Sequence, residues 1–468
     1  MGNIRLVRDV QLGARARTCR RVINPRTSVS SLPNEVLSAV FEAALVSSQS
    51  NRSWPHIELL VTRVARRWRD VALSTPQLWT YVYIPWGAKG RAKAEVYLSR
   101  SGALPLDLFL DIDENNDSSH AISHLANVIN CHAARWRSLR IDSVTVGEAG
   151  EWVCGAYALL TLLPSSVPLL EHIQLTIEEV YQREFRGHYP LDIYRAGAPS
   201  LTRIRIRGFG MHLCLPPSAT VTRLELHEAR DAIRFSSAKL ASMLAGLSAL
   251  KFLVINGDFI EEWVPATHIT MPSLQNFYVR AYRVEQIPAF LGMISAPLLQ
   301  SLLLDSMWGE DEFKDFGRFV DLRPGLSNYP RLRSLTIMAD YLSTQSWATI
   351  ASLYPTVTHI TLLCNDFNSF FGSLHRDQRS VTSTVSRWPE LHSLTLIDRP
   401  SKTPTLLRDT LASRIWFGQP IQKLYLSSCL MTQLSDDLGW IGENVDVEET
   451  RLYTGLQMDS PFIGWADD

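Results

Sequence analysis

One short apolar pattern recurs along most of the chain and limits the possible folds more than any other feature. The pattern is φ-x-x-φ-x-φ, where φ is an apolar residue, and it occurs ten times between residues 168 and 426, usually with a proline two positions before it. The copies are PLLEHIQL (168–175), PSLTRIRI (199–206), ATVTRLEL (219–226), SALKFLVI (248–255), PSLQNFYV (272–279), PLLQSLLL (297–304), PRLRSLTI (330–337), PTVTHITL (355–362), PELHSLTL (389–396) and the shorter PIQKLYL (420–426). Successive copies start 20 to 34 residues apart, which is the spacing of repeat proteins.

Each copy predicts one strand that follows a turn. The final φ-x-φ alternates as a half-buried strand does, and the residues before the next copy are enough for a helix or an irregular return. A single unit is too small to bury its apolar side, whereas stacked units share a core. We therefore expect an α/β fold in which the units form a solenoid with a parallel sheet on one face.

The pattern resembles that of leucine-rich repeats, L-x-x-L-x-L-x-x-N/C, at its three apolar positions. The asparagine or cysteine of that family occurs only at Asn365 and Cys429. Other copies have different side chains there: Asp258, Asp340, Glu178 and Arg399. The resemblance therefore implies an irregular array, with RWRSLRI (135–141) as a degenerate early copy and LPLDLFLDI (104–112) as a strand that caps it.

Two helical segments precede the repeats. LPNEVLSAVFEAAL (32–45) has Pro33 in the first turn of a predicted helix, and its apolar residues share one face. After a polar break at 47–55, the period of the apolar residues predicts a second helix from His56 to about Leu73. The sequence STP (74–76) ends it, and LWTYVYI (78–84) predicts a strand.

These segments closely resemble the F-box in its fungal form, in which a longer spacer separates two half-motifs. The matching residues are Leu32, Pro33, Glu35, Val36, Leu37, Val40, Phe41, Val64, Arg67, Trp68, Leu78 and Trp79. The match covers about 55 of 468 residues, and Ala65 stands where the family often has cysteine. The resemblance implies binding to Skp1, the adaptor that joins F-box proteins to a cullin–RING ubiquitin ligase.

The resemblance also implies which side chains contact Skp1. They are Leu32, Pro33, Val36, Leu37, Val40, Phe41, Val64, Trp68, Leu78 and Trp79. A segment of this size buries little surface alone, so an exposed apolar stripe on it is a candidate interface. The alternative is that these residues pack against the repeats.

The expected domains are a basic, disordered tail (1–28), the F-box (29–84), a connecting and capping segment (85–135) and the leucine-rich-repeat-like solenoid (136–468). Residues 1–30 contain seven arginines and one acid, a composition that also suits a mitochondrial transit peptide. The expected function is that of a substrate receptor, which binds an unknown protein on the array and Skp1, and through it a cullin, on the F-box. A non-catalytic repeat scaffold outside any ligase is the alternative.

Catalytic, metal-binding and cofactor motifs are absent from the sequence. His120 and His124 have the spacing of zinc ligands but no HExxH frame, and DIDENND (111–117) lacks the glycine of a calcium loop. We therefore expect neither an enzyme nor a cofactor.

Charge and composition bear on partners and location. The net charge is −1, so no global field attracts nucleic acid or anionic membranes, and no one-signed patch stands out on the array. Six isolated cysteines and the lack of a membrane-length apolar run predict a cytoplasmic or nuclear protein.

Overall fold

The computed structural model divides the chain into two compact units, residues 1–109 and 110–468. It describes residues 31–49, 56–113, 119–145, 155–179, 193–208, 219–228, 235–258, 260–262, 264, 268–282, 286–306, 328–339, 342–364, 366–374, 387–398 and 405–450. The basic tail and most of the DIDENND segment lie outside these residues. The unit boundary falls within the expected connecting segment 85–135, so that segment belongs partly to each unit.

Unit 1 consists of small helices around an apolar core. Its elements are α2 (Asn34–Gln49), α3 (Ile57–Val64), α4 (Arg66–Leu73), a 3-10 turn (Pro76–Trp79), β1 (Tyr81–Pro85) and α5 (Ala88–Arg100). The helices α2, α3 and α4 pack against one another. Leu37 and Phe41 of α2 enter the core together with Leu78 and Trp79, and the Trp79 indole donates to the Ala72 carbonyl at 2.9 Å.

Two predictions for unit 1 were wrong in detail. The helix expected over 56–73 is interrupted at Ala65, whose backbone is extended (φ −153°, ψ 162°). Helix α4 packs against α3, and for this reason the apolar residues of the two helices follow one period in the sequence. Arg69 Nε donates a hydrogen bond to the Thr62 carbonyl at 2.9 Å. The strand expected from Leu78 begins at Tyr81, since Pro76 starts a 3-10 turn instead.

In unit 2, every one of the ten copies forms one strand. These strands are β4 (His172–Glu179), β5 (Arg203–Gly208), β6 (Arg223–His227), β8 (Phe252–Asn256), β11 (Asn276–Ala281), β13 (Ser301–Ser306), β14 (Ser334–Ala339), β15 (His359–Cys364), β16 (Ser393–Asp398) and β17 (Lys423–Ser427). The degenerate copy forms β3 (Trp136–Thr145), and β18 (Asp446–Thr450) is a further strand that the pattern did not predict.

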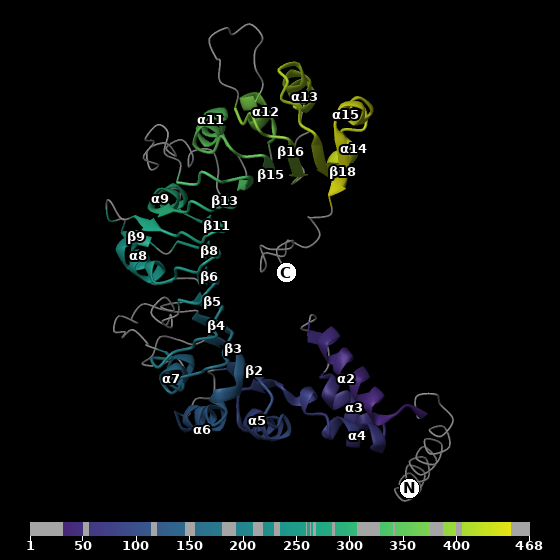
Figure 1. The fold of residues 1–468 in the computed structure, drawn as a ribbon, viewed down its shortest axis with the longest axis vertical. Helices are drawn as coiled ribbons and strands as arrows, with labels where there is room; N and C mark the ends of the chain where they lie inside the picture. Colours follow the sequence, from purple (N-terminus) through teal and green to yellow (C-terminus); the bar gives the residue numbers. More distant parts are fainter. Residues whose placement is uncertain are drawn as a thin grey trace, which may run out of the picture. The chain divides into compact units, whose positions relative to one another are not determined.

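The strands join in chain order into one 14-stranded sheet, β1-β2-β3-β4-β5-β6-β8-β11-β13-β14-β15-β16-β17-β18 (Figure 1). Neighbours from β3 to β18 pair in parallel, which confirms the predicted parallel sheet. LPLDLFLDI forms β2 (Leu106–Asp113), which lies between β1 and β3.

Short helices and strand pairs connect the copies. They are α6 (Ser119–Asn130), α7 (Gly155–Thr161), α8 (Ser237–Ala245), α9 (Gln286–Met293), α11 (Thr344–Leu353), α12 (Asn368–Leu374), α13 (Leu407–Trp416), α14 (Ser428–Gln433), α15 (Leu438–Asn444), a 3-10 turn (Ala133–Arg135), and the parallel pairs β7 (Phe235–Ser236) with β9 (Ile260–Glu262) and β10 (Ile269–Thr270) with β12 (Ile294–Ser295). Helices α8, α9, α11 and α12 lie on one side of the sheet (Figure 1). We call the opposite side the open face.

Cross-strand register stacks equivalent positions of the copies. All three apolar positions of every copy are at most 3% exposed, and they form continuous rows beneath the helices. The alternating residues of each strand therefore belong to the open face. The apolar pattern thus determines both the core and which side chains form the other surface.

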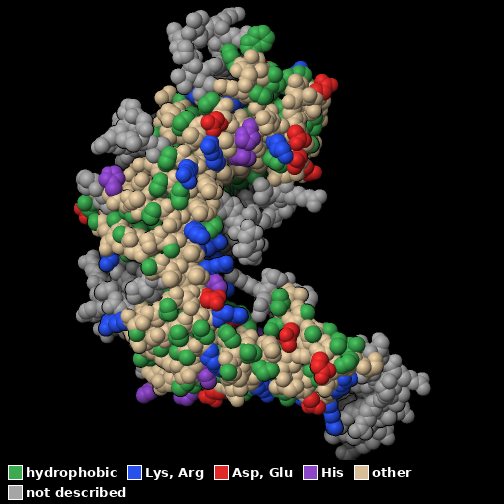
Figure 2. Space-filling model, in the orientation of Figure 1, with side chains coloured by type: hydrophobic (Ala, Val, Ile, Leu, Met, Phe, Trp, Pro, Cys, Tyr) green, Lys and Arg blue, Asp and Glu red, His purple; other side chains and the backbone are tan. Residues whose placement is uncertain are grey.

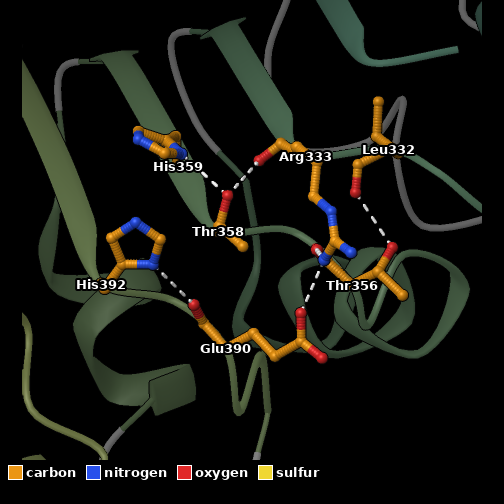
Figure 3. A network of polar contacts seen from close by, with 7 residues as sticks. All are labelled: Leu332, Arg333, Thr356, Thr358, His359, Glu390 and His392. Carbon is orange, nitrogen blue, oxygen red and sulfur yellow. Dashed lines mark hydrogen bonds and ion pairs between the residues drawn. The ribbon is translucent and has the colours of Figure 1, made fainter.

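A second ladder joins the turns before the strands. In each copy, the residue after the first apolar position donates its backbone N–H to the backbone carbonyl of the equivalent residue in the preceding copy. Thr358, for example, donates to the Arg333 carbonyl at 2.9 Å. The Thr358 hydroxyl bonds the same carbonyl at 3.2 Å, and the Arg333 guanidinium reaches both the Thr356 carbonyl (3.0 Å) and Glu390 (2.6 Å), so that three copies are connected (Figure 3). Side chains of the turns before the strands, such as Thr358 and Arg333, thus add hydrogen bonds between successive copies. Cys429 is exposed at the start of α14, and Asn365 lies outside the described residues.

Candidate functional site

The helices of unit 1 expose apolar side chains in two stripes. Val36 and Val40 are 42% and 50% exposed on α2, and Leu60 and Val64 are 42% and 59% exposed on α3. Each pair is spaced i, i+4, so its members lie on one face of their helix. A contiguous exposed apolar patch is a candidate surface for docking another protein, whereas single exposed apolar side chains are ordinary.

The structure separates the ten predicted contact residues into three groups by exposure. Leu37, Phe41, Leu78 and Trp79 are core residues at 0–1% exposure, so they shape the module and do not face a partner. The accessible residues are Pro33, Val36, Val40 and Val64. Leu32 and Trp68 are half-buried. The Trp68 ring lies 5.0 Å from that of Phe41, so Trp68 joins α4 to α2.

Arg67 connects the two half-motifs directly. Its guanidinium donates to the Asn34 side chain at 3.0 Å and to the Leu32 carbonyl. The first residues of α2 are therefore held by the start of α4. This contact links the LP-x-E and RRWRD segments within one folded module.

A buried carboxylate, which the apolar pattern did not indicate, ties α3 to α5. Glu58 is 4% exposed, accepts a hydrogen bond from the Tyr97 hydroxyl at 2.7 Å, and lies 3.0 Å from His56 Nδ1. Burial alone would raise the pKa of the Glu58 carboxyl, but the bonds from His56 and Tyr97 outweigh it and lower the pKa. The module is thus anchored to the rest of unit 1 by a charged group.

The Glu58 anchor predicts an acid-sensitive unit 1. Because the pKa of Glu58 is lower folded than unfolded, its contribution is complete above the unfolded pKa and is lost as pH falls through the folded pKa. The difference in melting temperature between about pH 7 and about pH 4 should be smaller in Glu58→Gln than in wild type. Glu35→Gln, at an exposed position of α2, is the control and should retain the wild-type difference. Equal pH dependence in wild type and Glu58→Gln would show that the anchor is unimportant.

On the open face of unit 2, the register of β4, β5 and β6 collects positive charge. Nine positions lie in three matched rows, which we call the basic grid: His172, Arg203, Arg223; Gln174, Arg205, Glu225; Thr176, Arg207, His227. Four arginines thus share this surface with one carboxylate. No one-signed charge patch stands out in the sequence, and the strand register is what brings these arginines together. The alternation RIRIR predicts one column, but only pairing with β4 and β6 creates the grid.

Glu225 is the internal counter-ion of the grid. Arg223 Nε donates to it at 2.7 Å, and Arg205 Nε and His227 Nε2 each lie 3.4 Å from its other oxygen. Burial would raise the pKa of Glu225, but the His227 hydrogen bond and the Arg223 and Arg205 charges outweigh it and set the pKa at about 2. Burial also lowers the pKa of His227. A neutral His227 donates through Nε2 to Glu225 and accepts through Nδ1 from Asn256 at 3.2 Å.

The excess positive charge ends at the neighbouring strands. On β3, Arg140 donates to Asp142, and β8 presents Phe252, Val254 and Asn256 in the matching rows. At the far end of the sheet, Lys423 of β17 meets Asp446 and Glu448 of β18. Figure 2 shows the blue side chains beside β4 to β6 and the red ones near β18.

The histidine pair of the sequence does not extend into a metal site. His120 and His124 are simply one turn apart on α6, and within the described residues no three potential metal ligands lie together. None of the helices described is both long enough and apolar enough to span a membrane.

No protein-family model matches the chain, and no curated protein sequence matches it significantly.

Proposed function

We propose that this protein is a non-catalytic substrate receptor of a Skp1–cullin ubiquitin ligase. In this proposal α2, α3, α4 and the following turn form an F-box that docks a Skp1-type adaptor, which connects the receptor to a cullin. Unit 2 is then an irregular leucine-rich-repeat-like solenoid that holds a protein substrate. Its single cysteines suit a reducing compartment, so we propose action in the cytoplasm or nucleus.

The observation that carries the proposal is the pair of exposed apolar stripes on the helices that bear both half-motifs. Val36, Val40 and Val64 belong to the motif and are exposed, as is Pro33, whereas Leu37, Phe41, Leu78 and Trp79 form the core of the module. An adaptor that covered these stripes would remove apolar area from water at about 25 cal/mol per Å². The receptor would contribute proximity, because holding substrate and ligase together raises their effective concentration.

The test is the affinity of the purified full-length protein for a fungal Skp1-type adaptor. Val36→Asp and Val40→Asp should each weaken binding about tenfold or more, because each places a charge in the apolar interface. Val96→Asp is the matched control, since Val96 is also 42% exposed on a helix of unit 1 but lies on α5, outside the motif. It should bind as wild type does, and all three variants should melt as wild type does.

Two results would reject the receptor proposal. The first is wild-type protein that does not bind the adaptor. The second is a folded Val36→Asp variant that binds it as well as Val96→Asp does. Either result would favour the non-catalytic scaffold acting outside a ligase.

A further inference from the structure

Arginines outnumber carboxylates four to one among the nine positions of the basic grid. Arg203 and Arg223 are register partners on adjacent strands, where like charges destabilise a sheet. Glu225 is the only acid among the nine positions, and Arg223 and Arg205 already surround it. Arg203, in contrast, is exposed at the start of β5. An anion bound from outside would relieve this repulsion.

The chemistry of the grid suits a carboxylate or phosphate. Guanidinium groups bind both anions through paired N–H donors, and they do so better than ammonium groups. The alternation of β5 places Arg203, Arg205 and Arg207 on one face, about 7 Å between successive members. Arg223 approaches from β6, with its guanidinium 5.7 Å from the centre of the Phe252 ring. Rigid strands therefore hold several donors in fixed positions around a small area.

The size of the grid decides between classes of anionic partner. Three strands span about 10 Å, which is the width of one or two anionic groups. Single-stranded nucleic acid needs a positively charged groove that follows its backbone over several nucleotides. Here the charge excess stops at the Arg140–Asp142 pair on one side and at Phe252 and Val254 on the other.

We propose that the basic grid binds an acidic segment of a protein, with a carboxylate or phosphate seated among Arg203, Arg205, Arg207 and Arg223. That the segment belongs to a ubiquitination substrate rests on the proposed receptor function, whereas the anion site itself does not. Glu225 then has two roles. It orients Arg205, Arg223 and His227, and it weakens anion binding by its own negative charge.

The test measures peptide binding to the full-length protein without any adaptor, by fluorescence anisotropy. The probes are a labelled peptide rich in glutamate, the same peptide with glutamine in place of glutamate, a glutamine peptide with one phosphoserine, and oligo(dT) of equal length. The glutamate or phosphoserine peptide should bind, with an affinity that falls as salt rises, and the neutral peptide should not. Comparing the glutamate and phosphoserine peptides distinguishes a carboxylate from a phosphate ligand.

Three variants test the site. Arg203→Gln with Arg207→Gln should weaken binding of the acidic peptide about tenfold or more. Lys423→Gln is the control, since Lys423 occupies on β17 the repeat position of Arg203 on β5, and it should have no effect. Glu225→Gln should strengthen binding several-fold, because it removes a negative charge from the site. A role for Glu225 in folding alone would not produce this gain.

The proposal is overturned if neither acidic peptide binds, or if the Arg203→Gln, Arg207→Gln protein binds as Lys423→Gln does. Oligo(dT) that binds more tightly than both acidic peptides and loses affinity in the double variant would instead make the grid a nucleic-acid site. If the wild-type protein bound an acidic peptide but not the adaptor, the receptor function would be rejected and the anion site would remain supported.

Discussion

Replacing Arg414 with methionine is expected to destabilise the C-terminal repeats by about 3 kcal/mol or more. Arg414 of α13 is 4% exposed, and its guanidinium donates to the carbonyls of Trp388 (3.0 Å), Leu391 (3.2 Å), Arg387 (3.3 Å) and Gln419 (3.0 Å). Methionine fills similar space but donates no hydrogen bond. The bonds to the Trp388 and Leu391 carbonyls are buried, and a buried carbonyl that is left unsatisfied costs about 1–3 kcal/mol.

The turn that Arg414 holds adds to this cost. Trp388 has a positive φ of 45° and is fully buried, with its ring 5.9 Å from that of Phe370. A left-handed backbone at a bulky residue persists only where its surroundings enforce it. Without the guanidinium, we expect the turn before β16 to open before the rest of the sheet.

Arg408→Met is the matched control, because Arg408 is on the same helix and forms a half-exposed ion pair with Asp437 at 3.0 Å. Exposed pairs of this kind contribute about 1 kcal/mol or less. Thermal melting should separate the two variants, and hydrogen exchange should show faster exchange near residues 387–391 only in Arg414→Met. Equal losses in both variants would contradict the role given to Arg414.

Gly208→Ala is expected to have a comparably large effect, about 4 kcal/mol. Gly208 ends β5 with φ 123°, and an added Cβ would lie 1.8 Å from the carbonyl oxygen of Ile177 on β4. Neither strand can move aside without breaking the register that the core depends on. Because Gly208 follows Arg207, the displacement should also weaken anion binding at the basic grid.

Gly418→Ala measures the backbone part of this effect, so its difference from Gly208→Ala gives the steric part. Gly418 also has a positive φ, 71°, but a Cβ added there would meet no other atom within 4 Å. It should cost only about 1 kcal/mol, the usual penalty for a left-handed alanine. Melting temperatures and hydrogen exchange of β4 and β5 provide the comparison, and similar losses in the two variants would rule out the close contact as the cause.

The apolar pattern predicted the strands of the ten copies because the two-residue alternation of buried and exposed side chains is a local property of each segment. It did not predict β18, whose sequence DVEET has a single aliphatic residue. That strand forms because its backbone continues the turn ladder, with the Asp446 N–H donating to the Gln422 carbonyl at 3.0 Å. Backbone pairing of this kind leaves no apolar signal in the sequence.

The site residues were predictable to different degrees, for physical reasons. The F-box resemblance pointed to the helices that carry the exposed stripes, but it does not distinguish Val36, which faces water, from Leu37, which faces the core. Helical period alone cannot make that distinction when both neighbours are apolar. Glu58 and the basic grid depend on contacts between distant segments, so the linear sequence held little sign of them.

The acidic character of β18 has a consequence for the behaviour of the protein in a crowded cell. The last strand in the sheet order presents one edge that no other described strand pairs with, and such edges invite another chain to add to the sheet. Asp446, Glu448 and Glu449 are three of its five residues. Two copies that met edge to edge would bring these carboxylates together, so β18 protects the end of the sheet against self-association through its charge.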